Sequence, residues 1–295
     1  MAINRRDFLK ITGMSLGGLA LTDPATSTFK KISKTVSADG NASMLYDATI
    51  CIGCKACQVA CKRRSNLPPV TDAEKIYEAP TDLSADVWTL IKLYQGEEGT
   101  SFVKAQCMHC IEPACVSVCP VAALEKTDTG PVVYHAERCI GCRYCMAACP
   151  FYIPKAQWYS NSPKIQKCDF CADRLAKGQN PACGDACPTG ALIYGKRGEM
   201  LATARSRIQD QNRYIDHVYG ETEAGGTDML YIAGVSMGKL GFPVLGSRSL
   251  PSYDWPYMLS VPWVIAVVSG LLTATYFYTH RNEDGKEVHD DRTNG

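Results

Sequence analysis

The chain has 295 residues, of which 46% are hydrophobic and 16 are cysteines, and its formal net charge is +1. A chain of this length buries a sizeable core, so it does not need cysteine cross-links as a small secreted domain does. The balanced charge gives no reason to expect a nucleic-acid partner.

The N-terminus has the pattern of an export signal. Residues 4–21 read NRRDFLKITGMSLGGLAL, in which two arginines precede a modest apolar stretch over residues 11–21. This segment resembles a twin-arginine signal, with Asn4 in place of the usual leading Ser or Thr. We assign residues 1–38 to the signal and a linker, and we expect the polar segment 27–43 to be flexible. An ordinary amphipathic or secretory N-terminus is the alternative.

The sixteen cysteines form four groups of four and occur nowhere else. In chain order the groups are Cys51, Cys54, Cys57 and Cys61; Cys107, Cys110, Cys115 and Cys119; Cys139, Cys142, Cys145 and Cys149; and Cys168, Cys171, Cys183 and Cys187. Groups one and three have the spacing C-x2-C-x2-C-x3-C of bacterial ferredoxins, and a proline follows group three. Three thiolates on one loop can bind three irons of a cubane, and the fourth cysteine ligates a second cluster.

Two other uses of clustered cysteines compete with this interpretation. Zinc sites bring two C-x2-C pairs from separate knuckles, whereas a third cysteine at the same spacing is crowded for a single ion. Disulfides are compatible with an exported protein, but C-x-x-C disulfides tend to be reducible redox centres, and eight of them would be strained. Iron-sulfur clusters therefore fit the pattern better than zinc or disulfides do.

An internal repeat supports the cluster interpretation. The segments CIGCKACQVAC from Cys51 and CIGCRYCMAAC from Cys139 agree at seven of eleven positions. The segments PACVSVCPVAAL from Pro113 and PACGDACPTGAL from Pro181 agree at seven of twelve. The order of the two motif types along the chain is that expected of a duplicated two-cluster unit.

Residues 51–187 resemble the four-cluster ferredoxin-like subunits of molybdopterin oxidoreductases and membrane-bound hydrogenases, through these sixteen cysteines. In that family one ferredoxin unit is inserted in another, so group one pairs with group four and group two with group three. The resemblance implies four 4Fe-4S clusters whose ligand sets, numbered one to four, are Cys51, Cys54, Cys57 and Cys187; Cys61, Cys168, Cys171 and Cys183; Cys107, Cys110, Cys115 and Cys149; and Cys119, Cys139, Cys142 and Cys145. Because Cys115 is present, we expect a cubane where some relatives hold a 3Fe-4S centre.

The expected fold class is α+β, with nested bacterial-type ferredoxin units that each hold two 4Fe-4S clusters. The four-cluster domain spans residues 44–197, and an extension with a helix and many turns spans residues 198–254. Strands are expected at residues 86–94, 101–105, 191–195 and 228–235. A helix is expected at residues 198–209, where apolar residues recur at helical spacing.

The C-terminal region predicts a membrane anchor. Residues 255–280 contain no Asp, Glu, Lys or Arg, and residues 259–278 are long enough to span a bilayer core of about 30 Å. We assign residues 257–280 to a transmembrane helix and residues 281–295 to a cytoplasmic tail. Three basic residues follow the helix, namely Arg281, Lys286 and Arg292. They favour an N-out, C-in orientation at the periplasmic face of the inner membrane. A buried helix of a soluble protein is the alternative.

Clusters would change the charge of the domain. An oxidised cubane with four thiolates carries about −2, so four of them move the formal balance from +1 to about −7. Positive side chains close to the motifs could raise cluster potentials, although each could equally belong to a solvated surface. These candidates are Arg143, Lys155, Lys164 and Lys167. His109, between two cysteines of group two, is expected to pack or to form hydrogen bonds rather than to bind iron.

The sequence predicts electron transfer rather than catalysis. It contains no H-E-x-x-H motif, no phosphate-binding glycine loop and no plausible Ser-His-Asp set. The resemblance implies two partners: a catalytic oxidoreductase and an integral membrane subunit that reacts with quinone. The export signal favours a periplasmic NiFe hydrogenase of the hydrogenase-2 type, with large and small subunits, over a formate dehydrogenase, whose beta subunit typically lacks a signal. A structural zinc or disulfide tether is the alternative of another class.

Overall fold

The computed structural model describes residues 38–69, 82–210 and 212–280. The predicted twin-arginine motif and cytoplasmic tail lie outside these residues. The described helices are η1 (Ala38–Gly40), α3 (Ala56–Arg64), α4 (Ala114–Ser117), α5 (Tyr144–Ala148), α6 (Ala172–Leu175), α7 (Ala182–Asp185), α8 (Arg197–Ile208), η3 (Glu223–Gly225) and α9 (Pro251–His280). The strands are β1 (Ala42–Asp47), β2 (Leu90–Gly96), β3 (Gly99–Ala105), β4 (Leu124–Lys126), β5 (Val132–Tyr134), β6 (Lys155–Ala156), β7 (Ile165–Gln166), β8 (Leu192–Lys196) and β9 (Met229–Ile232).

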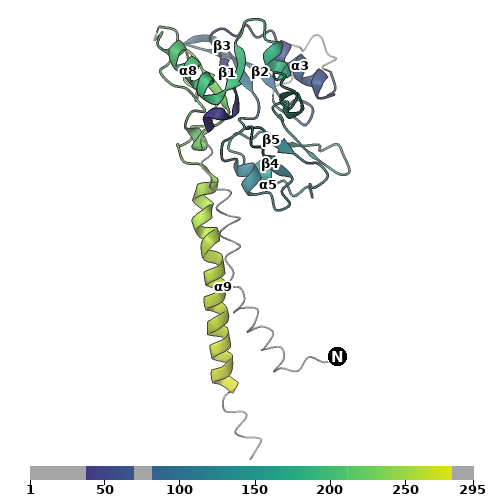
Figure 1. The fold of residues 1–295 in the computed structure, drawn as a ribbon, viewed down its shortest axis with the longest axis vertical. Coiled ribbons are helices and arrows are strands. Elements are labelled where there is room, and N and C mark those ends of the chain that lie inside the picture. The colour runs from purple at the N-terminus through teal and green to yellow at the C-terminus, as the bar shows by residue number, and fades with distance from the viewer. Residues whose placement is uncertain (1–37, 70–81, 211, 281–295) are drawn as a thin grey trace, which may run out of the picture. The chain divides into compact units, whose positions relative to one another are not determined.

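A three-stranded sheet of order β8-β1-β9 brings together the two ends of the cysteine region (Figure 1). Strand β1 precedes the first cysteine group and pairs antiparallel with β8, which follows the fourth, so that Tyr46 lies opposite Leu192. Strand β9 pairs parallel with β1 on its other edge, with Met44 opposite Met229. Along the chain, the loops and short helices that carry the cysteines therefore lie between β1 and β8, which are adjacent strands of one sheet.

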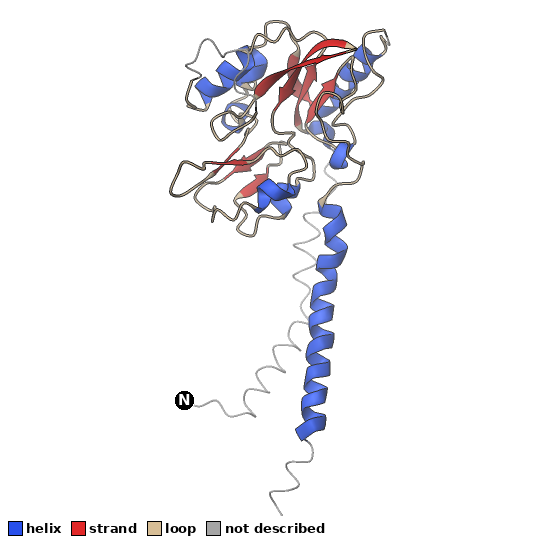
Figure 2. Ribbon diagram, turned by 180° about the vertical axis from the view of Figure 1, so that it is seen from behind, coloured by secondary structure: helices blue, strands red, loops and turns tan. Residues whose placement is uncertain are grey.

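The alternation of side chains along β1 divides the core into two clusters. Leu45 packs with Leu230 and with the apolar face of α8, which covers one side of the sheet (Figure 2). Met44 and Tyr46 point to the opposite side and join a cluster that contains Cys57 and other cysteine ligand candidates. Because successive side chains in a strand point to opposite faces, one strand supports both α8 and the cysteine loops.

Three two-stranded hairpins complete the described sheet structure. Strands β2 and β3 pair antiparallel from Leu90 opposite Ala105 to Gly96 opposite Gly99. Strands β4 and β5 lie between the second and third cysteine groups, and β6 pairs with β7 between the third and fourth. Because a hairpin pairs residues that are near one another in the chain, each of these hairpins separates cysteine groups without a large core of its own.

Most of the predicted elements are confirmed. The strand expected at 101–105 lies within β3, the strand expected at 191–195 is β8, and the helix expected at 198–209 is α8. The strand expected at 228–235 is confirmed as β9, although it is shorter. The strand predicted at 86–94 begins only at Leu90, because the residues before it form a turn in which Ser84 and Val87 exchange backbone hydrogen bonds of 3.2 Å.

The expected flexible linker over residues 27–43 is wrong at its C-terminal end. Ala42 and Ser43 belong to β1, and Ser43 is fully buried. Its hydroxyl donates a 2.7 Å hydrogen bond to the backbone carbonyl of Asp228. Pairing with two neighbouring strands satisfies polar groups that would otherwise favour solvent, so composition alone misidentified this segment.

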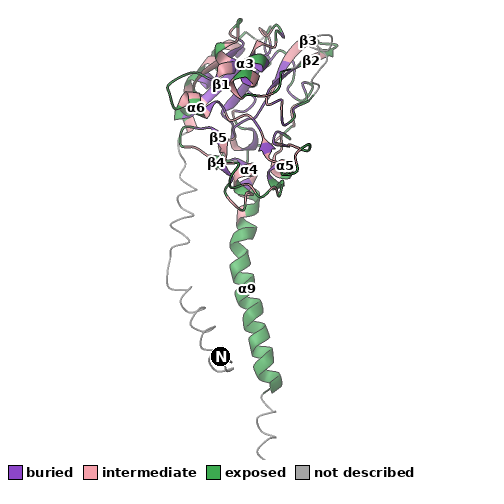
Figure 3. Ribbon diagram, turned by 90° about the vertical axis from the view of Figure 1, so that its right-hand side faces the viewer, coloured by how far each residue is buried: buried purple, intermediate pink, exposed green. Residues whose placement is uncertain are grey.

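Helix α9 is exposed from Pro256 to its C-terminal end in Figure 3, whereas Pro251 at its start is buried. It has 30 residues, its most apolar 18-residue stretch has a mean hydropathy of 1.8, and none of that stretch is buried. Among the described residues it is the one helix that is long and apolar enough to cross a membrane. It begins at Pro251, a position where a proline is well tolerated, and residues 257–280, predicted as the anchor, lie within it.

Candidate functional site

All sixteen cysteines lie in the described residues, and none of them forms a disulfide. The two C-x2-C-x2-C loops have the same backbone conformation: Gly53 and Gly141 have φ values of 68° and 74°, and Lys55 and Arg143 have φ values of 58° and 62°. Each of these left-handed segments turns the chain into a short helix, α3 or α5. The two loops that share the repeated motif therefore also share their backbone conformation.

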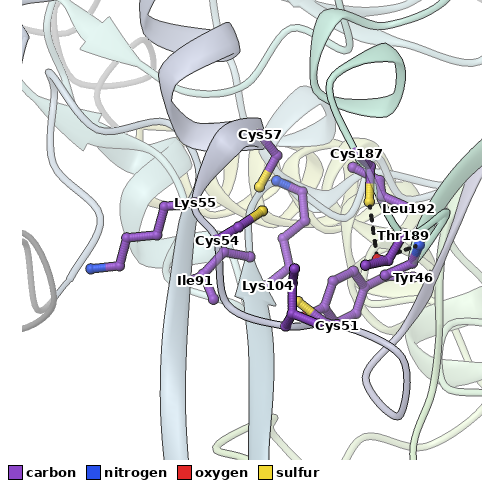
Figure 4. A pocket seen from close by; sticks show the side chains of 12 residues that line it. Tyr46, Cys51, Cys54, Lys55, Cys57, Ile91, Lys104, Cys187, Thr189 and Leu192 are labelled. Carbon is purple, nitrogen blue, oxygen red and sulfur yellow. Dashed lines mark hydrogen bonds between the residues drawn. The ribbon is translucent and has the colours of Figure 1, made fainter.

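The first predicted ligand set lines a common cavity. Cys51, Cys54 and Cys57 approach it from the loop and first turn of α3, and Cys187 approaches it from the loop before β8 (Figure 4). Burial raises the pKa of Cys51, and Cys57 and Cys187 are among the neighbours that raise it. Cysteines more than a hundred residues apart are therefore close enough to interact.

The cysteines of the second set are also electrostatic neighbours. Burial raises the pKa of Cys61 to about 11, and the thiol of Cys171 raises it as well. Burial raises the pKa of Cys183 to about 12, with contributions from Cys171 and Cys61. Burial raises the pKa of Cys168 well above its ordinary value, and Cys61 and Cys183 act in the same direction.

In the third set Cys107 is buried, and Cys110, Cys115 and Cys149 are half-buried. Burial raises the pKa of Cys110 well above its ordinary value, and the neighbouring thiols of Cys107, Cys149 and Cys115 raise it further. Burial raises the pKa of Cys149 to about 11, and Cys107 again contributes. These four residues come from groups two and three, which nest inside groups one and four along the chain.

The fourth set surrounds α5. Burial raises the pKa of Cys145 to about 11, and the thiols of Cys139, Cys119 and Cys142 raise it further. The backbone N–H of Ala123 donates to the sulfur of Cys119 at 3.2 Å. Such N–H donors would stabilise a reduced cluster and raise its potential.

Three interactions connect the sets to one another in a line. The thiols that act across neighbouring sets are Cys57 on Cys183, Cys107 on Cys168, and Cys145 on Cys115. They join the first set to the second, the second to the third, and the third to the fourth. At the two ends of this line Cys54 and Cys142 are exposed, whereas the other fourteen cysteines are buried or intermediate.

The donor set fits cubanes better than single ions. In the described part of the chain, no three His, Cys, Asp or Glu side chains are arranged so as to share one metal ion. A cubane presents four irons at separate corners, so its thiolates are spread more widely. The raised pKa values mean that burial disfavours these thiolates without a compensating positive charge, which iron would supply.

Two lysines are buried among the cysteines. Lys104 on β3 is fully buried, and its ammonium group donates to the hydroxyl of Thr89. Lys167 is also buried and donates to the carbonyl of Val132 and, at 2.9 Å, to that of Cys168. Lys167 was a sequence candidate, whereas Lys104 was missed because it lies outside every motif. The one weak sequence signal for Lys104 is that a lysine occurs within a predicted strand.

The other three basic candidates interact with surface side chains or with loop backbone. Arg143 lies over the ring of Trp158 at 4.3 Å, and Lys155 lies 3.7 Å from a carboxylate oxygen of Asp82. Lys164 donates to two backbone carbonyls, at 3.1 and 3.5 Å. Each of these three side chains has a surface or loop-bracing partner, so only Lys167 of the four candidates is an internal charge.

His109 packs and forms hydrogen bonds, as the sequence indicated. Its Nδ1 accepts a 2.9 Å hydrogen bond from the backbone N–H of Val132, and its ring meets that of Phe170 edge-on at 4.7 Å. Burial lowers the pKa of His109 well below its ordinary value, and Lys167 and Lys126 lower it further. The histidine is therefore a neutral internal brace.

Comparisons of the sequence with known proteins identify iron-sulfur relatives. Residues 99–197 match the model of the 4Fe-4S dicluster domain. The chain is 35% identical to the hydrogenase-2 operon protein HybA of Escherichia coli O157:H7, over 84% of this chain and 86% of the relative. It is 40% identical to a protein of Nitratidesulfovibrio vulgaris over 95% of this chain and 78% of that one. It is 38% identical to the iron-sulfur subunit of the nitrate-inducible formate dehydrogenase of Escherichia coli, over 70% and 73%.

The chain belongs to this family of 4Fe-4S iron-sulfur subunits. As a member of the family it carries four 4Fe-4S clusters and transfers electrons, and it is not itself the catalytic subunit. The predicted family and cofactors are thereby confirmed. The similarity covers both hydrogenase and formate dehydrogenase relatives, so it establishes the role of the chain but leaves its catalytic partner to be proposed.

Proposed function

We propose that the chain relays electrons between a periplasmic NiFe hydrogenase of the hydrogenase-2 type, which oxidises H2, and a quinone-reactive subunit in the membrane. The observation that carries this proposal is the linear order of the four cysteine sets. Because one cysteine is exposed at each end of this line, an electron can enter the relay at one end and leave it at the other. The 35% identity to HybA over most of both chains favours a hydrogenase partner.

We assign the cluster ligands to the four sets named from the sequence. The electrostatic neighbours of the buried thiols support each set, including the crossed pairing of Cys187 with group one and of Cys61 with group four. The paired strands β1 and β8 flank the outer groups, and β4 and β5 lie between the inner ones. This arrangement supports one ferredoxin unit nested inside another.

The clusters supply one-electron transfer, and the chain fixes their separation and their surroundings. Backbone N–H groups, such as that of Ala123 at the Cys119 sulfur, favour the more negative state. Burial acts to raise the pKa of Cys187, but the backbone of Leu192, Thr189 and Ala191 together with the Thr189 hydroxyl lowers it. Burial of the inner cysteines excludes water from the middle of the relay, while Cys54 and Cys142 bring its ends to the surface.

The proposed location is the periplasmic face of the inner membrane. Helix α9 supports a single C-terminal anchor, since its exposed apolar surface needs a covering that the described part of the chain does not provide. The basic residues after the helix favour a cytoplasmic C-terminus, and the twin-arginine pattern favours a periplasmic cluster domain. One membrane crossing satisfies both signals.

A formate dehydrogenase partner is the second candidate. It is favoured by the 38% identity to the iron-sulfur subunit of a formate dehydrogenase over 217 residues. Both candidates use the same relay, so the cluster domain alone does not distinguish them. They differ only in the enzyme that delivers the electrons.

Anaerobic purification of the complex from membranes tests the proposal. Hydrogen should reduce the clusters, as seen by bleaching of their visible absorbance and by EPR, and formate should not. Reduction by formate alone would favour the second candidate. Iron and acid-labile sulfide should each approach about sixteen per chain. Zinc in their place would overturn the relay and leave a structural tether.

A further inference from the structure

Lys104 lies between two of the proposed cluster sites. It belongs to β3, is fully buried, and lines the cavity of the first set together with Cys51, Cys54 and Cys57 (Figure 4). Cys57 of the first set packs in one buried cluster with Cys183 of the second set, and the charge of Lys104 acts on both Cys61 and Cys183. We propose that Lys104 is a shared internal cation that raises the reduction potentials of the first and second clusters together. This inference rests on the proposed ligand sets.

The surroundings of Lys104 leave the sulfurs as its counter-charges. No carboxylate of a described residue forms an ion pair with it, and its hydrogen-bond partner is the neutral hydroxyl of Thr89. Lys104 lines the same cavity as Cys51, Cys54 and Cys57, so the ligand sulfurs are negative groups close to its charge. A buried ammonium without a carboxylate would be costly unless another negative group stood nearby.

A fixed cation acts differently on the two redox states. An oxidised cluster with four thiolates carries about −2, and one added electron takes it to about −3. The electron comes from the catalytic partner, which is oxidised as the cluster is reduced. Lys104 attracts the more negative state more strongly, so it shifts both potentials in the positive direction. In a water-poor interior this attraction is weakly screened.

The position of Lys104 sets it apart from the second buried lysine. Lys167 counteracts the effect of burial on Cys115 and Cys149, both of the third set. It is held by backbone carbonyls rather than by a hydroxyl. Lys104 therefore acts on the first and second cluster sites, and Lys167 acts on the third.

Redox titration of the anaerobically purified full-length complex, followed by EPR, tests the proposal. K104M should move the midpoint potentials of two clusters to more negative values and leave the other two unchanged, at full iron content. K104R, which keeps the charge, should restore most of the shift. K92M is the matched surface control, because Lys92 lies on the neighbouring strand with a half-exposed side chain, and it should move none.

The outcomes separate this inference from the proposed function. A K104M complex with four clusters at unchanged potentials would overturn the role of Lys104 and leave the relay intact. Wild-type protein without four clusters would overturn the relay itself. If K104M loses iron, the iron content of K104R is the deciding measurement. Full iron in K104R would support a requirement for the positive charge. The same loss of iron in K104R would overturn the proposal, because the shape of the lysine side chain and not its charge would then be what matters. K167M should shift one cluster, different from those that K104M shifts.

Discussion

The ammonium nitrogen of Lys126 lies 2.6 Å from Oδ2 of Asp228, and this ion pair joins hairpin β4–β5 to the start of β9. Asp228 is fully buried and also accepts a 3.2 Å hydrogen bond from the amide of Asn41. Burial raises the pKa of Asp228, and Lys126 offsets part of this effect. This ion pair therefore links the hairpin between cysteine groups two and three to the sheet β8-β1-β9. The buried Asp228 carboxylate would be costly without its partner.

Replacing Lys126 by methionine should destabilise the protein by about 3–5 kcal/mol at neutral pH, because it leaves the Asp228 carboxylate buried and unpaired. The pKa of Asp228 is already raised and should rise further in K126M. Since a raised pKa in the folded state gives stability that is lost as pH rises, the deficit should shrink in acid and grow toward neutrality. Urea midpoints of the anaerobic holoprotein, read from cluster absorbance at several pH values, measure it. The double variant K126M/D228N should recover part of the loss, and a deficit independent of pH would contradict this account.

Replacing Cys187 by serine tests the crossed pairing of the ligand sets. The first cluster should lose one iron or be lost entirely, so that total iron falls from about sixteen to between about twelve and fifteen per chain. The cluster held by Cys61, Cys168, Cys171 and Cys183 should keep its EPR signal. Iron analysis together with EPR of the reduced protein gives the answer. Loss of that second cluster in its place would show that group four does not pair with group one.

Glycines 53 and 141 offer a matched pair of substitutions in the two repeated loops. Both have positive φ, where alanine costs about 1–2 kcal/mol. At Gly53 an added methyl group would also overlap the ring of Phe102, whereas at Gly141 its nearest neighbour, the carbonyl of Pro163, is 3.8 Å away.

G53A should therefore reduce the iron content and the urea midpoint more than G141A does. Equal losses in the two variants would show that backbone strain alone decides, and that the contact with Phe102 does not matter. Circular dichroism of both variants would establish whether the remaining fold is retained.

A charge placed in α9 should weaken membrane integration according to its depth. Arginine at Val268, in the middle of the apolar stretch, should cost about 2.5–3.5 kcal/mol. The same residue at Tyr278 should cost much less, since its side chain can reach the interface. Carbonate extraction of membranes would measure the retained fraction. Equal retention of V268R and the wild type would argue against a spanning helix.

The sequence alone determined the family, the cofactors and the identity of the sixteen candidate ligands, because cubane ligation imposes a fixed spacing on cysteines in one loop. It also indicated α8, through apolar residues at helical spacing, and α9, through a long stretch without charged residues. It misidentified Ser43 as part of a linker and placed the start of β2 too early, because sheet pairing and a local turn overrode composition there.

Only the tertiary structure decided which strand lies beside β1 opposite β8 and which charges lie near the cysteines. Parallel pairing of β1 with β9 joins segments that are far apart in the chain, and no local pattern specifies such a partner. The placement of Lys104 between two cysteine sets has the same origin, since a strand lysine is usually solvated. Spacing along the chain fixes which atoms can bind one metal centre, whereas the charge around that centre depends on residues that only folding brings near.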